Sequence, residues 1–302
     1  MLTTAAILAI ASVSNPGAPP DSSLLGLTLT DSPESRVERT STAEALPGLL
    51  GLAPSTALPA KSGLDLIHPR TFFTYTLSTG KQEIMFNTTD PANVPPNPKG
   101  DETALFHGLR GEYFFANQFG VYFTGDFGTV KDISIDFNGT PESIDIDTLL
   151  LFLGASYRAT IDDDFRMPVR IGPYYHKATI KGFASDIDYE TIGLKLVAEP
   201  EYIVFQHLEA DRMSELTVFL EVGIGTGPTT VEDSTFKEKG NAFSAGLELG
   251  VRYKFFNGIL VGLSFIDRKQ YYGATDSYDN GFVFFGTEDD YLGVGLTVGG
   301  RM

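Results

Sequence analysis

The sequence predicts an all-β fold: a transmembrane antiparallel up-and-down β-barrel of about ten strands, with eight or twelve as alternatives. Three observations predict it. Long segments alternate strictly between apolar and small or polar residues, these segments recur along the chain, and their connections alternate between short and long. Globular strands usually stop near about five or six residues, whereas a tilted strand that crosses a bilayer needs about nine to eleven. The length of the alternation therefore favours a membrane.

Asn241–Phe255 shows the pattern best. Phe243, Leu247 and Val251 belong to an apolar row, while the residues between them are small or charged. Successive side chains of a strand point to opposite faces, so such a segment has one apolar and one polar face. In chain order the segments with this alternation are Phe72–Leu77, Thr103–Phe115, Phe119–Phe127, Leu149–Thr160, Met167–His176, Tyr189–Ala198, Leu216–Ile224, Asn241–Phe255, Ile259–Arg268 and Tyr291–Met302. Two stretches leave the strand count open, because Lys81–Asn87 could form another strand after a turn and Glu199–Phe205 could prolong its neighbour or add one.

The connections indicate topology. Three are short: Ala116–Gln118, Ile161–Arg166 and Asn257–Gly258. Others are expected to be long and polar, namely Ser78–Glu102, Lys131–Thr148, Lys177–Asp188, Thr226–Gly240 and Lys269–Asp290, with His207–Ser214 as a mild exception. Short turns on one rim and long loops on the other are typical of outer-membrane barrels.

The apolar row is expected to face lipid. Its partner row is rich in Gly, Ser and Thr with scattered charges, which suits a wet or salt-bridged interior, whereas a soluble barrel or sandwich would turn its apolar row inward. Aromatic residues lie near the row ends, where interfacial girdles form. These are Tyr113, Phe115, Phe119, Tyr157, Tyr175, Tyr253 and Phe255.

The last segment strengthens this interpretation. Leu292, Leu296, Val298 and Met302 are in phase, and from about Phe72 onward the chain resembles the small outer-membrane β-barrel proteins of Gram-negative bacteria. Their last strand ends in an aromatic residue that the insertion machinery reads, a position that Met302 takes here. The resemblance implies location in a Gram-negative-type outer membrane. It also implies two partners, the outer-membrane lipid with its lipopolysaccharide and the outer-membrane assembly machinery.

The region before the barrel differs in composition. Of 17 Pro residues, 12 lie before position 103. Residues 1–14 contain a short apolar run that resembles a signal peptide without its positive start, residues 15–65 are expected to be a flexible leader, and residues 66–302 form the barrel. A leader folded into the barrel as a plug is the alternative.

Composition excludes several functions. The net charge of −17 without a basic patch argues against a nucleic-acid partner, and the absence of Cys removes disulfides and thiolate chemistry. No cofactor is expected. One hypothesis is that divalent cations bind the acidic loops. In the alternative interpretation the carboxylates of these loops are hydrated and serve only to keep the loops soluble. The acidic residues concerned are Asp132, Asp136, Asp145, Asp147, Asp186, Asp188, Asp276, Asp279, Asp289 and Asp290.

The polar row supplies the candidate lumen residues. They are the basic Arg110, Arg158, Arg170, Lys195, Arg252, Lys254 and Arg268, the acidic Glu112, Asp126, Glu221 and Glu248, and His176, which is expected to join this network beside Arg170. An unpaired buried charge is costly, so a salt-bridge network that fills the lumen is predicted, with a selective pore of net positive charge as the alternative.

Enzymatic barrels use recognisable His spacings. Outer-membrane phospholipases and lipid A deacylases place Ser two residues after a His, and omptin proteases place Asp two residues before one. None of His68, His107, His176 and His207 fits either pattern, and Asp65 lies three residues before His68, on the opposite face of a strand. The sequence therefore predicts a non-enzymatic barrel, either structural and surface-exposed or a narrow passive channel for small solutes. A surface protein that binds partners through long acidic extracellular loops is the next alternative, and a lipid- or peptide-cleaving enzyme the last.

Overall fold

A computed structural model describes residues 71–88, 98–115, 118–137, 140–160, 164–183, 185–209, 212–234, 237–274 and 284–301. The expected signal peptide and leader lie outside the described residues. All regular structure in the described part is β-strand, and no helix there is long and apolar enough to cross a membrane.

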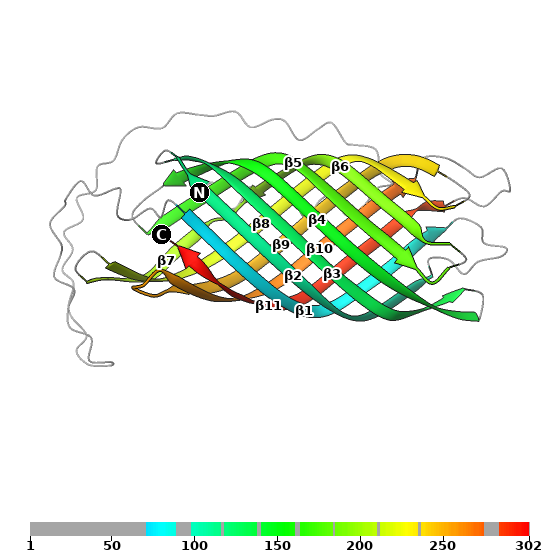
Figure 1. The fold of residues 1–302 in the computed structure, drawn as a ribbon, viewed down its shortest axis with the longest axis horizontal. Helices are drawn as coiled ribbons and strands as arrows, with labels where there is room; N and C mark the ends of the chain where they lie inside the picture. Colours follow the sequence, from blue (N-terminus) through cyan, green and yellow to red (C-terminus); the bar gives the residue numbers. More distant parts are fainter. Residues whose placement is uncertain are drawn as a thin grey trace, which may run out of the picture. The chain divides into compact units, whose positions relative to one another are not determined.

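The strands form one closed antiparallel barrel (Figure 1). With one exception, neighbours along the chain pair with each other, and the first strand closes the ring by pairing with the last, with Phe72 opposite Arg301. In chain order they are β1 (Thr71–Thr88), β2 (Lys99–Phe114), β3 (Phe119–Phe137), β4 (Thr140–Thr160), β5 (Phe165–Lys181), β6 (Ile187–Ala198), β7 (Glu201–Glu209), β8 (Arg212–Glu232), β9 (Lys237–Lys254), β10 (Ile259–Ala274) and β11 (Phe284–Arg301).

Eleven strands occupy ten positions in the wall, because β6 and β7 follow one line. Both pair with β5 and with β8, and only Glu199 and Pro200 separate them. Proline has no N–H to donate to a neighbouring strand, which explains the interruption. The predicted ten-stranded barrel is confirmed. Glu199–Phe205 prolongs its neighbour, and Lys81–Asn87 is part of β1.

The predicted long connections are wrong in extent. Lys131–Thr148, for example, was expected to be a loop, but β3 runs to Phe137 and β4 starts at Thr140. The strands reach 21 residues in β4 and β8, about twice the length that a bilayer requires. The short connections lie where they were predicted, on the rim that also carries Thr71 and Arg301. We call this the terminal rim and the opposite one the distal rim.

The half of the barrel next to the terminal rim has an apolar exterior. Phe73, Leu109, Phe123, Leu153 and Ile171 are examples of large side chains exposed there, from 36% for Leu109 to 59% for Leu153. Such residues continue around the wall, as on β6, β9, β10 and β11. Except for Tyr175, the aromatic residues predicted near the row ends flank the short turns, with Tyr113 and Phe115 both more than half exposed. We call this surface the apolar band, and its extent identifies it as the part that lipid covers.

The half next to the distal rim inverts the pattern. Its outward row is charged, while its inward row forms one buried apolar cluster, the distal core: Ile84, Phe86, Ala104, Phe106, Val130, Ile133, Ile135, Ile144, Ile146, Ala178, Ile180, Tyr189, Val231, Ala242, Ile266, Tyr272 and Tyr291. The inversion explains the incorrect loop predictions. These segments do alternate, but with the apolar residues on the inward face.

A bulge on β3 maintains the inward row of the distal core. Val130 lies opposite Ile146 and Ile133 opposite Ile144, so β3 has one extra residue there. Asp132 takes a positive φ of 59°, and its N–H donates to Asp145 Oδ1 at 2.9 Å. Because the extra residue shifts the alternation, the odd-numbered Ile133 and Ile135 point inward after the even-numbered Val130.

Candidate functional site

The lumen of the terminal half is lined by ion pairs between buried arginines and glutamates. Nearest the terminal rim, Arg301 Nη2 donates to both carboxylate oxygens of Glu201, at 2.9 Å each, and Arg301 Nη1 reaches Glu215 at 3.2 Å. Arg166 also contacts Glu201 and Glu215. These four side chains are 7% exposed or less.

A second layer lies deeper in the barrel and centres on Arg170. Its guanidinium bonds both oxygens of Glu112, at 2.9 and 3.1 Å, and Glu199 Oε2 at 2.6 Å. The other oxygen of Glu199 accepts from Arg252, so this carboxylate joins two guanidinium groups. Ser156 donates to Glu112 at 2.5 Å. Shared acceptors make this a network rather than a set of separate pairs.

A third cluster pairs one arginine with two glutamates. Arg110 donates to Glu248 at 2.5 Å and to Glu221 at 3.3 Å. Aromatic faces complete the packing of the guanidinium groups in the lumen. Arg170 lies 4.2 Å from the centre of the Tyr122 ring, and Arg252 lies 3.5 Å from that of Phe219. Such cation–π contacts stabilise charges that have left water.

The predicted lumen residues all lie on inward-facing strand positions, but they do not form one cluster. Arg110, Glu112, Arg170, Glu221, Glu248 and Arg252 belong to the layers described above. Arg158 stacks on Phe114 at 3.6 Å near the terminal rim, and Lys254, the last residue of β9, forms no ion pair among the described residues. Asp126 contacts Arg268 at 3.5 Å.

His176 lies away from Arg170, contrary to the expected network membership. Its Nδ1 is 2.8 Å from the Tyr272 hydroxyl, and the two rings stack. Tyr272 packs in turn on Tyr189, whose hydroxyl is 2.8 Å from Thr287 Oγ1. His176 therefore belongs to the border of the distal core. Two inward positions of β5, Gly172 and Tyr174, separate it from Arg170.

Sequence reasoning missed five charged lumen residues, Arg166, Glu199, Glu201, Glu215 and Arg301. Each lies at or just beyond the end of a predicted segment and in phase with its inward row, so extending the alternation would have found them. They change the charge balance slightly. The predicted set holds seven basic and four acidic residues, and the structure adds two arginines and three glutamates, so nine basic residues face seven acidic ones and the expected positive excess falls from three to two.

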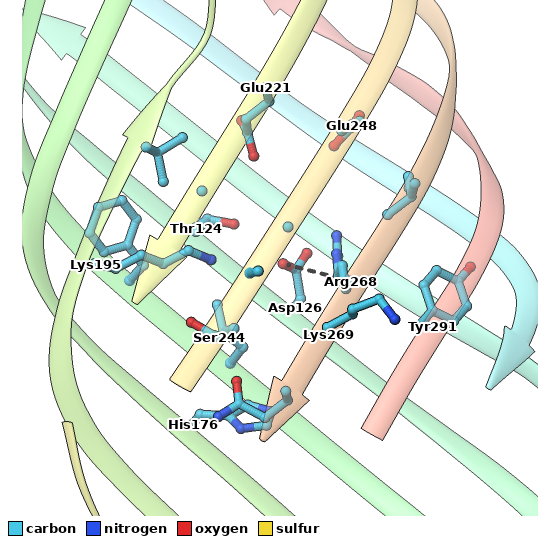
Figure 2. Close-up of a pocket in the computed structure, with 18 of the residues that line it drawn as sticks. Thr124, Asp126, His176, Lys195, Glu221, Ser244, Glu248, Arg268, Lys269 and Tyr291 are labelled. Carbon is cyan, nitrogen blue, oxygen red and sulfur yellow. Dashed lines mark ion pairs between the residues drawn. The ribbon is translucent and has the colours of Figure 1, made fainter. Parts of the chain in front are cut away.

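A cavity of about 100 Å³, lined by both polar and apolar side chains, lies between the ion pairs and the distal core. Figure 2 shows some of the side chains around it, among them Asp126, Lys195 and Arg268. Arg110, Tyr122 and Glu248 line it on one side, and Phe106 and Ile266 on the other. Its wall also holds Asp126, Lys195, Arg268, Ser244, Thr124 and Gln82.

Several groups of this wall are incompletely paired within the described part of the chain. Lys195 forms no ion pair there, and the buried hydroxyl of Thr124 and the Gln82 carbonyl oxygen have no hydrogen-bond partner. Gln82 instead donates its amide to Asp289 at 2.6 Å. A cavity with these polar groups and this volume suits a few water molecules or a small ion.

The acidic residues expected in loops lie mostly on strands. Asp147 pairs with Lys181 at 2.5 Å, Asp188 with Lys177 at 3.0 Å and Asp290 with Lys269 at 2.8 Å. Asp276 and Asp279 lie outside the described residues. Within the described ranges, no group of three His, Asp or Glu side chains gathers as metal ligands would. Lysines therefore neutralise three of these acidic residues.

No protein-family model matches the sequence, and no curated protein sequence matches it. Among solved structures it is similar to the outer membrane protease OmpT from Escherichia coli, at 10% identity and a TM-score of 0.42, over 76% of this chain and 97% of OmpT. It is also similar to the P. putida toluene transporter TodX, at 8% identity and a TM-score of 0.28, over 77% of this chain and 90% of TodX. Neisserial surface protein A gives 12% identity and a TM-score of 0.29, over 75% and 96% of the two chains. These similarities concern the barrel fold alone.

Proposed function

We propose that the protein is a non-enzymatic, sealed β-barrel of a Gram-negative-type outer membrane. It holds its distal half as a rigid structure on the cell surface. The observation that carries this proposal is the distal core, which fills the barrel with packed apolar side chains beyond the lipid-covered part. Ile133, Ile135 and Ile144 are at most 1% exposed. Outer-membrane lipid, including lipopolysaccharide, surrounds the apolar band, and the assembly machinery that inserts such barrels reads β11.

The terminal half supports the same proposal. A pore selective for anions needs mobile, net positive charge along its wall, whereas at least two carboxylates hold each of five lumen arginines, Arg110, Arg166, Arg170, Arg252 and Arg301. The cavity of about 100 Å³ holds a few small molecules at most. Charge pairing at one end and apolar packing at the other both oppose continuous passage of hydrated ions.

The surroundings of the described histidines favour a non-enzymatic barrel. His176 contacts Tyr272, His107 contacts Tyr75, and His207 packs against Phe205 and Phe256. A nucleophilic Ser needs a base within hydrogen-bond reach, and a base needs an orienting carboxylate. None of these three histidines has such a pair of partners in the described part of the chain.

Planar-bilayer recording of the refolded protein tests the sealed barrel. We expect no discrete conductance steps from the wild type, although gel migration that depends on heating shows a folded barrel. Regular steps from folded wild-type protein would contradict the proposal. Failure to fold in vesicles, or fractionation as a soluble protein, would contradict the membrane location instead.

A narrow channel gated by the distal core is the second candidate, and the cavity behind that core favours it. In that case replacing the distal core should open a path from the cavity to the distal rim. The double variant Ile133→Ser/Ile146→Ser introduces hydroxyls at two inward positions of β3 and β4. Conductance in this variant alone would identify the distal core as the gate, whereas a closed, folded variant would favour the sealed barrel.

A further inference from the structure

An ionisable side chain faces lipid within the apolar band. His107 belongs to the outward row of β2, between Leu105 and Leu109, which are 46% and 36% exposed. Its Nδ1 lies 2.6 Å from the hydroxyl of Tyr75, an outward residue of β1, and its ring stacks on Phe127 at 5.1 Å between centres. Ionisable groups are rare on a lipid-facing surface, and where they occur they mark function more often than packing.

The pair keeps one hydrogen-bond donor for a further partner. If Tyr75 donates to Nδ1, the imidazole carries its proton on Nε2, and if the imidazole donates, the phenol O–H remains. Either donor would be costly to leave unpaired in hydrocarbon. A ligand that brings an oxygen acceptor to this depth of the membrane would satisfy it.

An apolar groove of about 520 Å³ begins beside this pair. It crosses β2, β1, β11, β10 and β9, which are successive neighbours in the wall (Figure 1). Two rows of outward side chains border it. One row is Leu105, Thr79, Val294, Phe265 and Leu249, and the other is Leu77, Leu296, Leu263 and Val251. Leu77 lies directly opposite His107, so His107 ends the second row.

The groove descends from the histidine towards the terminal rim. His107 lies seven residues before the end of β2 at Phe114, whereas Val251 lies three residues before the end of β9 at Lys254. Both strands end at the terminal rim, so the His107 end is the one nearer the distal rim. Neighbouring strands are about 4.8 Å apart, which gives the groove a length of about 19 Å across its five strands. One leaflet of hydrocarbon is about 15 Å thick, so an acyl chain lying obliquely matches this length.

Charged side chains lie farther along the same two strands, towards the distal rim. Lys81 on β1 and Lys99 on β2 are both more than half exposed. Lys81 contacts Asp101 at 3.1 Å and Glu83 at 3.8 Å, and Lys99 contacts the same Glu83 at 3.4 Å. Each ammonium group has three donors, so these contacts leave at least one donor on each lysine for a phosphate. The wall therefore presents cations, then a hydrogen-bond donor, then an apolar groove, in the order of a lipid's phosphate, carbonyl and acyl chain.

We propose that β9, β10, β11, β1 and β2 bind one lipopolysaccharide molecule of the outer leaflet. An acyl chain occupies the groove, an ester, amide or hydroxyl oxygen near its head bonds the Tyr75–His107 pair, and a phosphate binds Lys81 and Lys99. The proposal rests on the outer-membrane location proposed above. Lipopolysaccharide is chosen over phospholipid because the polar end of the site faces the distal rim, which belongs to the outer leaflet when the short turns are periplasmic.

Native mass spectrometry of the folded barrel in detergent tests this, with rough-type lipopolysaccharide and phosphatidylglycerol as separate probes. The double variant Tyr75→Phe/His107→Leu removes both possible donors of the pair and should lower the lipopolysaccharide-bound fraction about tenfold, as expected for one hydrogen bond in a dry site. Leu296→Trp, which places a large ring in the groove, should cause a similar loss. Leu194→Trp is the matched control, because Leu194 faces lipid on β6 and is 63% exposed, away from the groove. This variant should retain wild-type binding.

The outcomes separate the two proposals. Equal lipopolysaccharide retention by all folded variants would overturn the site, as would equal or stronger binding of phosphatidylglycerol. Heat-dependent gel migration shows that each variant is folded before its lipid is measured. A wild type that does not fold or insert would count against the outer-membrane barrel itself, whereas a folded, lipid-free wild type would count against this site only.

Discussion

The two halves of the barrel place their apolar residues on opposite faces of the same strands. In the terminal half lipid covers the exterior, so apolar residues point outward and charged residues pair inside. In the distal half water covers the exterior, so charged residues point outward and the distal core fills the inside. Each long strand carries both arrangements, and the inversion falls within it. Solvent on the outer face, rather than strand geometry, thus determines which row is apolar.

The difference also predicts how each half is stabilised. The terminal half depends on buried charges that must stay paired, because losing one partner leaves the other charge unpaired in a dry interior. The distal half depends on close apolar packing, as the core of a soluble protein does. Exposed ion pairs on its outer face contribute little in comparison.

The largest effect is expected from Glu199→Ala, because Glu199 joins Arg170 and Arg252. Removing its carboxylate leaves two buried guanidinium groups without their shared partner and should lower the free energy of unfolding by about 3–5 kcal/mol. Urea unfolding in phospholipid vesicles, followed by gel migration, measures it. Glu232→Ala is the control, since Glu232 pairs with Lys237 on the exposed surface. A loss for Glu199→Ala no larger than that of the control would show that the lumen is wet and the pairs are weak.

A smaller effect is expected from Ile144→Ala in the distal core. Ile144 is 1% exposed, and its truncation should cost about 2–4 kcal/mol, because the surrounding side chains cannot fill the space. Leu153→Ala removes the same number of carbon atoms from a lipid-facing position that is 59% exposed. Lipid acyl chains can fill that space, so the loss should be smaller in the same vesicle assay. Equal losses would mean that the distal half is not packed as a closed core.

The sequence predicted the terminal half well because, along that whole half, one face of each strand meets lipid and the other faces the polar lumen. The ten-stranded barrel, the outward apolar row of each segment and the short turns all follow from period-two alternation. The prediction of long loops in the distal half is wrong. Residues such as Ile133, Ile135, Ile144 and Ile146 alternate too, but with the apolar phase inverted and, in β3, shifted by a bulge at Asp132.

The sequence predicts which face of a strand each lumen residue occupies, but not which residue it contacts across the lumen. Alternation alone says that Arg110 and Glu248 point inward, but it cannot say that they meet, because they lie 138 positions apart and on non-adjacent strands. The same holds for Arg301 and Glu201, 100 positions apart. Meeting across a lumen depends on barrel diameter and strand stagger, which no local pattern encodes.

The smallest effect is expected from the exposed ion pairs of the distal half. Lys269 and Asp290 lie 2.8 Å apart, with side chains 61% and 38% exposed. A double-mutant cycle of Lys269→Ala and Asp290→Ala should give a coupling energy below about 1 kcal/mol, since water screens both charges. The coupling should fall further in about 1 M salt, where the Debye length is about 3 Å. A coupling of several kcal/mol that resists salt would place this pair in a dry environment. The boundary of the apolar band would then lie nearer the distal rim than the exposed side chains indicate.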